Sequence, residues 1–128
     1  MTMTYVIDGA EVTGLDRFWQ VIGAAVNGPD GYFGRNLDAL ADCLHGGFGT
    51  PDDGDYVIEW RAHDLSRQAL GHEETARELR RRLARAHPGN RAALSTRLAE
   101  AEAGLGPTIF DELTGLFEEE APGVLRLR

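Results

Sequence analysis

Two short β-prone runs with helical patterns between them constrain the fold of this chain more than any other feature. Residues 5–8 (YVID) end at Gly9, and residues 55–60 (DYVIEW) form a second run of the same kind. Between them, apolar residues recur with helical spacing over 14–26, and again from residue 36 to residue 44 or 45. Strands that are joined through helices pair in parallel by a crossover connection. We therefore expect an α/β protein with a parallel sheet and packed helices.

The second half of the chain adds more helices and a third strand. A short helix is expected over residues 64–70, and residues 72–106 have the pattern of a helical hairpin with a break at 87–90. A last helix begins at Pro107, because proline is favoured in the first helical turn. Residues 124–127 then form a third strand. The sequence thus predicts a three-stranded sheet and a helical hairpin.

The helical segment that begins at Asn36 carries two carboxylates that are not stabilised by local interactions within the helix. Its apolar stripe consists of Leu37, Leu40, Ala41 and Leu44. Asp38 and Asp42 lie outside this stripe, one turn apart, where like charges repel by a few tenths of a kcal/mol. Asp42 is also in the last turn, where the helix dipole disfavours an anion. Such uncompensated placements are expected mainly at functional sites. We interpret this face as one that meets a positively charged partner.

The length of 128 residues predicts a single domain over residues 1–128. Charge is unevenly distributed along this domain. The net charge is −8, made up of −8 over residues 1–60, +3 over 61–106 and −3 over 107–128. All thirteen basic residues are arginine. An acidic N-terminal half argues against direct nucleic-acid binding, which requires cations that neutralise phosphates. It favours a basic protein partner, although acidity that serves only solubility remains the simpler alternative from charge alone.

No segment has the features of a membrane or secretory signal. No uncharged apolar window of 18 residues exists, so no membrane partner is expected. The N-terminus lacks a basic region followed by an apolar one, which makes the cytoplasm the expected location. The single cysteine, Cys43, cannot form an internal disulfide, which agrees with a reducing compartment.

The arginines at 80–82 could suggest a nucleic-acid site on the hairpin. However, Glu73 and Arg77, and likewise Glu78 and Arg82, have the i,i+4 spacing and order that stabilise a helix. A charged run on an amphipathic helix is usually a solvated face. We therefore expect no direct nucleic-acid partner.

Residues 32–46 read YFGRNLDALADCLHG, which contains an uninterrupted NLDAL and then an aspartate, a cysteine and a leucine. This pattern resembles the signature of the barstar family, the intracellular inhibitors of barnase-type ribonucleases. The resemblance covers about residues 5–70 and 107–128. It implies a barstar-like, three-stranded parallel sheet with packed helices, in which residues 72–106 are an inserted helical hairpin.

The resemblance also implies that this chain is an inhibitor whose second helix blocks the active site of a barnase-type ribonuclease. Asp42 would occupy the site of a substrate phosphate, and Asp38 would pair with another cation of the enzyme. Glu119 would supply a peripheral carboxylate, a role that Glu112 or Glu118 could also take. The implied nuclease-binding residues are Tyr32, Asn36, Leu37, Asp38, Ala41, Asp42, His45, Gly46, Gly47 and Glu119.

The rim of this site departs from the family pattern, which keeps other functions open. Ala41 and Gly47 stand where aromatic residues are expected, with Phe48 one place later. One alternative is a barstar-like module that binds a different protein, either a toxin nuclease or a regulator. An enzyme is the other alternative. Asp38, Asp42 and His45 lie on one helix face and could bind a metal, or the two carboxylates could act as acid and base, but no second cluster of ligands supports either. We expect no catalytic residues, metal or cofactor.

Overall fold

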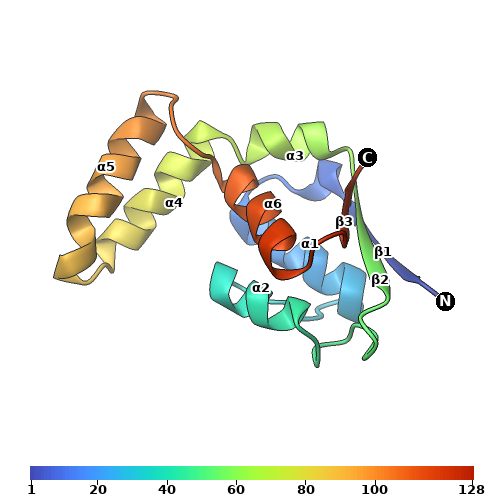
Figure 1. Cartoon of the computed structure of the whole chain (residues 1–128). Coiled ribbons are helices and arrows are strands. Elements are labelled where there is room, and N and C mark those ends of the chain that lie inside the picture. Colours follow the sequence, from blue (N-terminus) through green and yellow to red (C-terminus); the bar gives the residue numbers. More distant parts are fainter.

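The computed structural model describes all residues from 1 to 128 and has an α/β architecture (Figure 1). Its sheet contains three parallel strands in the order β1-β2-β3, namely β1 (Met3–Asp8), β2 (Tyr56–Arg61) and β3 (Leu125–Leu127). Its helices are α1 (Leu15–Asn27), α2 (Leu37–Leu44), α3 (His63–Ala69), α4 (His72–Ala84), α5 (Arg91–Glu102) and α6 (Ile109–Glu120). The predicted three-stranded parallel sheet with packed helices is confirmed.

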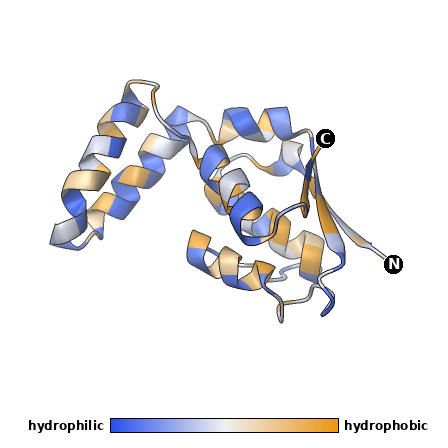
Figure 2. Ribbon diagram, viewed as in Figure 1, coloured by the Kyte–Doolittle hydropathy of each residue, from blue (hydrophilic) through white to orange (hydrophobic).

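One face of the sheet packs against α1, α2 and α6 and forms the main core (Figure 1). Residues of β1 and β2 alternate between this core and solvent, as strand geometry requires. The largest fully buried side chains are Trp60, Phe18, Phe33, Phe110 and Phe117. Hydrophobic residues in Figure 2 accordingly concentrate on the strands and on the inner sides of these helices. Because α2 is part of this core, its outer face is held on a rigid support.

Local sequence signals fix the ends of α2 and α6. The Asn36 side chain accepts a hydrogen bond from the Ala39 backbone N–H at 2.8 Å and caps the N-terminus of α2. Gly46, with a φ of +118°, follows the end of the helix. Thr108 and Asp111 form a reciprocal capping box at the start of α6.

Helices α4 and α5 pack against each other as a hairpin that extends away from the sheet (Figure 1). A small hydrophobic cluster of Ala76, Leu79 and Ala101 joins them. Two short 3₁₀ turns complete the fold, at Gly9–Glu11 and, at the tip of this hairpin, at Pro88–Asn90. None of the six helices is both long enough and apolar enough to cross a lipid bilayer.

The arginines of α4 are not simply a solvated face, which corrects the expectation from their spacing. Arg82 contacts Glu78 at 3.6 Å as predicted, but Arg77 pairs with Glu74 at 3.5 Å instead of Glu73. Arg82 also reaches across to α6, where it meets Glu112 at 3.4 Å. Sequence spacing identifies partners on the same helix and cannot reveal partners on other helices.

Three further contacts fix the hairpin relative to the sheet-bearing part of the molecule. Arg97 of α5 donates to the half-buried Glu112 at 2.7 Å. Arg81 of α4 meets Asp16 of α1 at 3.3 Å. The Glu74 carboxylate accepts a hydrogen bond from the backbone N–H of Leu15 at 2.7 Å, so α4 caps the N-terminus of α1. The hairpin is therefore positioned by charged groups rather than by a large apolar interface.

Candidate functional site

The outer face of α2 presents two carboxylates that have no partner within the protein. Asp38 and Asp42 are exposed, and neither side chain makes an ion pair or a hydrogen bond. On the opposite side of the helix, Leu40, Cys43 and Leu44 are buried in the core. This arrangement leaves the local repulsion between the two aspartates uncompensated and the face free for an external cation.

The remaining predicted site residues of α2 lie at the border of the core. Leu37 is half-buried and packs against the main core, and Ala41 is also half-buried. They add shape to the acidic face rather than charge.

Tyr32 lies on a tight loop that precedes α2 in the sequence. Gly34 in this loop has a φ of +98°, a conformation that favours glycine. A Cβ atom at Gly34 would lie 2.9 Å from the backbone nitrogen of Leu40. Glycine is therefore required for the loop to pack directly on α2. The Tyr32 side chain is 43% exposed beside the helix.

A second aromatic side chain, Phe48, lies beside Tyr32 on the loop that follows α2. Gly46 and Gly47 both have positive φ and turn the chain there. The ring centroids of Tyr32 and Phe48 are 6.4 Å apart, and Phe48 is 43% exposed. The sequence reasoning did not include Phe48 among the site residues. The signal in the sequence that could have identified Phe48 was an aromatic residue within a glycine-rich segment.

Asn27, at the C-terminal end of α1, holds these two loops together. Its side-chain Nδ2 donates to the backbone carbonyl of Tyr32 at 2.6 Å and to that of Phe48 at 2.7 Å. No local pattern marks Asn27 in the sequence, because its two partners are brought together only by the fold.

The C-terminal end of α2 is tied to α6 by a further contact. His45 Nε2 lies 2.6 Å from a carboxylate oxygen of Glu120. Of the acidic residues considered for the rim, Glu112 is engaged by two arginines of the hairpin, whereas Glu118 and Glu119 are exposed and unpaired. Glu119 therefore remains available as a peripheral carboxylate, and Glu112 does not.

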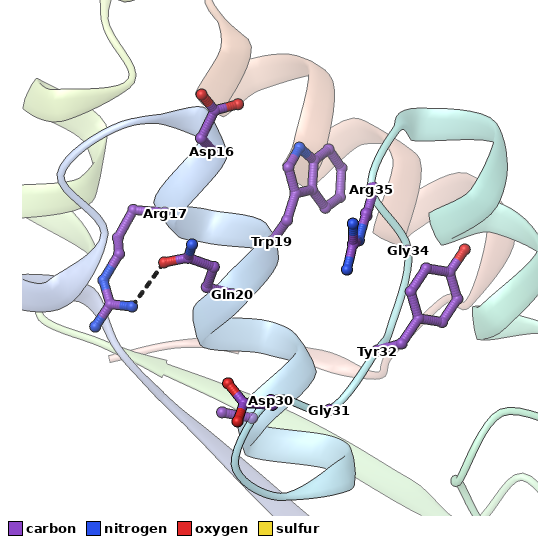
Figure 3. A pocket seen from close by; sticks show the side chains of 10 residues that line it. Asp16, Arg17, Trp19, Gln20, Asp30, Gly31, Tyr32, Gly34 and Arg35 are labelled. Carbon is purple, nitrogen blue, oxygen red and sulfur yellow. Dashed lines mark hydrogen bonds between the residues drawn. The ribbon is translucent and has the colours of Figure 1, made fainter.

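Two clefts border this face. One, of about 500 Å³, lies between α2 and α4 and is lined by Asp38 on one side and by Arg81 and Arg85 on the other. The other, of about 570 Å³, lies between α1 and the loop that carries Tyr32 (Figure 3). Trp19, half-buried on α1, and Arg35 line both clefts.

Cys43 is the titratable group of α2 whose pKa is shifted. Burial raises the pKa of the Cys43 thiol above its ordinary value, and the adjacent Asp42 carboxylate raises this pKa further. A thiol of this kind is a poor nucleophile at neutral pH. No group of three or more His, Cys, Asp or Glu side chains is arranged to hold a metal ion. Asp38, Asp42 and His45 therefore do not converge on one point.

The fold and this surface define a class: an α/β protein with a three-stranded parallel sheet that displays an acidic helix beside a pair of exposed aromatic residues. A comparison with protein-family models matches residues 2–103 to a family described as Barstar (barnase inhibitor). The match covers most of the chain, and the protein belongs to the barstar family.

Proposed function

We propose that this protein inhibits a barnase-type ribonuclease by inserting the acidic face of α2 into the cationic active-site cleft of that enzyme. The observation that carries the proposal is the exposed, unpaired pair Asp38 and Asp42 on a helix that is anchored in the core. A cleft that binds the phosphates of RNA is positively charged, so two carboxylates one turn apart can replace two phosphates there. The description of the family as barnase inhibitors supports this partner.

The rigid support of α2 favours tight binding. Its N-cap, its buried apolar side and its following glycine turn fix the backbone before the partner arrives. Preorganisation of this kind lowers the entropic cost of association. Charged pairs that become desolvated at the centre of an interface can then contribute strongly to affinity.

The residues around the two aspartates have supporting roles in this proposal. Tyr32 and Phe48 provide an aromatic surface at one side of the acidic face, and aromatic residues are enriched in interface cores. The backbone at Asn36 and at the Gly46–Gly47 turn shapes the two ends of α2. Peripheral polar contacts come from His45 and Glu119.

A stoichiometric titration tests the proposal. Increasing amounts of the protein are added to a barnase-type ribonuclease, and cleavage of a fluorogenic RNA substrate is measured. We expect cleavage to stop near one protein per enzyme. The substitution Asp42→Ala should weaken binding by about 2–5 kcal/mol, a range measured in part on the barnase–barstar complex itself.

The matched control is Asp52→Ala, which removes the same charge from an exposed residue in the loop before β2 that has no side-chain partner. This variant should inhibit as the wild-type protein does. Equal inhibition by Asp42→Ala and Asp52→Ala would show that Asp42 does not enter the active site. Failure of the wild-type protein to inhibit would reject the proposal as a whole.

The altered rim favours one second candidate, a barstar-like module that binds another toxin nuclease or a regulator. Ala41 and Gly47 lack aromatic side chains, so the contact surface around the aspartates differs from the family pattern. Binding to a toxin nuclease without inhibition of any barnase-type ribonuclease would favour this candidate. In either case we expect the protein to act in the cytoplasm, where the free thiol of Cys43 is stable.

A further inference from the structure

The arginines that surround the cleft between α2 and α4 fall into two groups. Arg81 and Arg82 are engaged by carboxylates of α1, α4 and α6, and these contacts hold the hairpin in place. Arg35 and Arg85 line the same cleft but make no ion pair and no side-chain hydrogen bond. The first group is structural, whereas the second group presents two uncompensated positive charges to solvent.

These two free cations lie next to the proposed inhibitory face. Asp38 lines the same cleft as Arg35 and Arg85. Arg35 and Asp38 therefore line the cleft at the start of α2, and Arg85 lines it at the end of α4. A partner that covers Asp38 therefore lies beside Arg35 and Arg85, which line the same cleft.

We propose that Arg35 and Arg85 form a basic rim that contacts carboxylates at the border of the ribonuclease active site. The inference rests on the proposed function and adds that the partner carries acidic residues beside its active site. The target is a nuclease whose cationic cleft is bordered by acidic residues on the side that faces α4.

Charge complementarity selects a protein partner over RNA for this rim. The same cleft also contains the carboxylates of Asp16, Asp38, Glu78 and Glu112. A polyanion would meet these acids wherever it met the arginines, whereas a folded protein can place individual carboxylates opposite Arg35 and Arg85. The ion pairs of Arg81 and Arg82 join α4 to α1 and α6, and so hold in place the helix that ends at Arg85.

Exposed rim charges influence association rates and salt dependence more than they influence dissociation. An exposed ion pair is a weak attraction, and reversal of one charge replaces it with a weak repulsion. We therefore expect Arg35→Glu and Arg85→Glu each to slow association by about threefold to tenfold at low salt. Because exposed charges are screened, the effect should nearly vanish at about 1 M salt.

The experiment measures association of each variant with the barnase-type ribonuclease that the wild-type protein inhibits, by stopped-flow tryptophan fluorescence. The matched control is Arg126→Glu, which makes the same charge change at an exposed, unpaired residue of β3 away from both clefts. Thermal unfolding of each variant verifies that it is folded. Arg126→Glu should slow association less than either rim variant.

A second arm tests the chemistry of the partner. The carboxylates that border the active site of the nuclease are converted to amides. The proposal predicts that Arg85→Glu and Arg126→Glu then associate with the altered nuclease at the same rate. Persistence of the difference would overturn the assignment of acidic residues as the contact.

The outcomes separate this inference from the proposed function. Association of both rim variants at the control rate or faster, while Asp42→Ala still loses inhibition, would overturn the basic rim alone. Loss of inhibition by the wild-type protein, or equal inhibition by Asp42→Ala and its control, would remove the proposed function and the rim together.

Discussion

The substitution Asn27→Asp tests how the two loops beside α2 are held in place. The amide of Asn27 donates to the carbonyl oxygens of Tyr32 and Phe48 at 2.6 and 2.7 Å. Aspartate has nearly the same shape but no donor at neutral pH. The substitution therefore removes both hydrogen bonds and places a negative charge against two carbonyl oxygens.

The magnitude follows from the number and exposure of these bonds. A hydrogen bond contributes about 0.5–1.5 kcal/mol net, so the pair contributes about 1–3 kcal/mol. Because Asn27 is exposed and water can replace the lost partners, we expect a loss of about 1–2 kcal/mol. For a domain of this size, that loss lowers Tm by roughly 3–8 °C. If the loops open without global unfolding, affinity for the proposed ribonuclease target should fall by up to about thirtyfold.

The assay combines thermal unfolding followed by circular dichroism with titration calorimetry against the ribonuclease. The control is Asn90→Asp at the tip of the hairpin, where the side chain makes no hydrogen bond. The control should retain wild-type Tm and affinity. A wild-type Tm and affinity for Asn27→Asp would refute the view that this residue positions the two loops.

Two further predictions concern the hairpin and alkaline stability. Glu112→Gln should weaken both ion pairs to the hairpin, lower the free energy of unfolding by about 1–2 kcal/mol and reduce hydrogen-exchange protection in α4 and α5. The control Glu118→Gln should change neither quantity. Unchanged protection in Glu112→Gln would contradict the role of the Glu112 carboxylate. Burial raises the pKa of Cys43 and of Tyr56 in the folded state, so their contribution to stability is complete below the ordinary thiol pKa of about 8.5 and is lost as pH rises through the raised values. Few other groups titrate in this range, because the chain contains no lysine. Urea unfolding should therefore show that the free energy of unfolding falls above about pH 9, and this fall should be smaller in Cys43→Ala. A flat profile up to pH 10.5, about half a unit above the ordinary tyrosine pKa, would contradict this prediction.

Much of the fold follows from periodicity and from turn residues. The ends of α2 are fixed by Asn36 and Gly46, whose capping roles depend only on neighbouring backbone. The third strand could be placed because Pro122 and Gly123 end the preceding helix before an alternating run. Short-range rules suffice where the interacting groups are close in sequence.

The parts of the site that sequence reasoning missed depend on contacts between distant segments. Asn27 meets Phe48 across 21 residues, and His45 meets Glu120 across 75. Glu112 was considered for the rim, but two arginines of the hairpin engage it. No local pattern encodes these pairings, because they exist only once the helices have packed.

Competition with a nucleotide ligand tests most directly whether the carboxylates of α2 replace RNA phosphates. Binding of the protein to the ribonuclease is measured at increasing concentrations of a non-hydrolysable dinucleotide that occupies the active site. We expect the apparent Kd to rise in proportion to the dinucleotide concentration once the enzyme is saturated with it, because Asp42 and the phosphate require the same site. A ternary complex, with an apparent Kd that stays constant as the dinucleotide is added, would contradict the account.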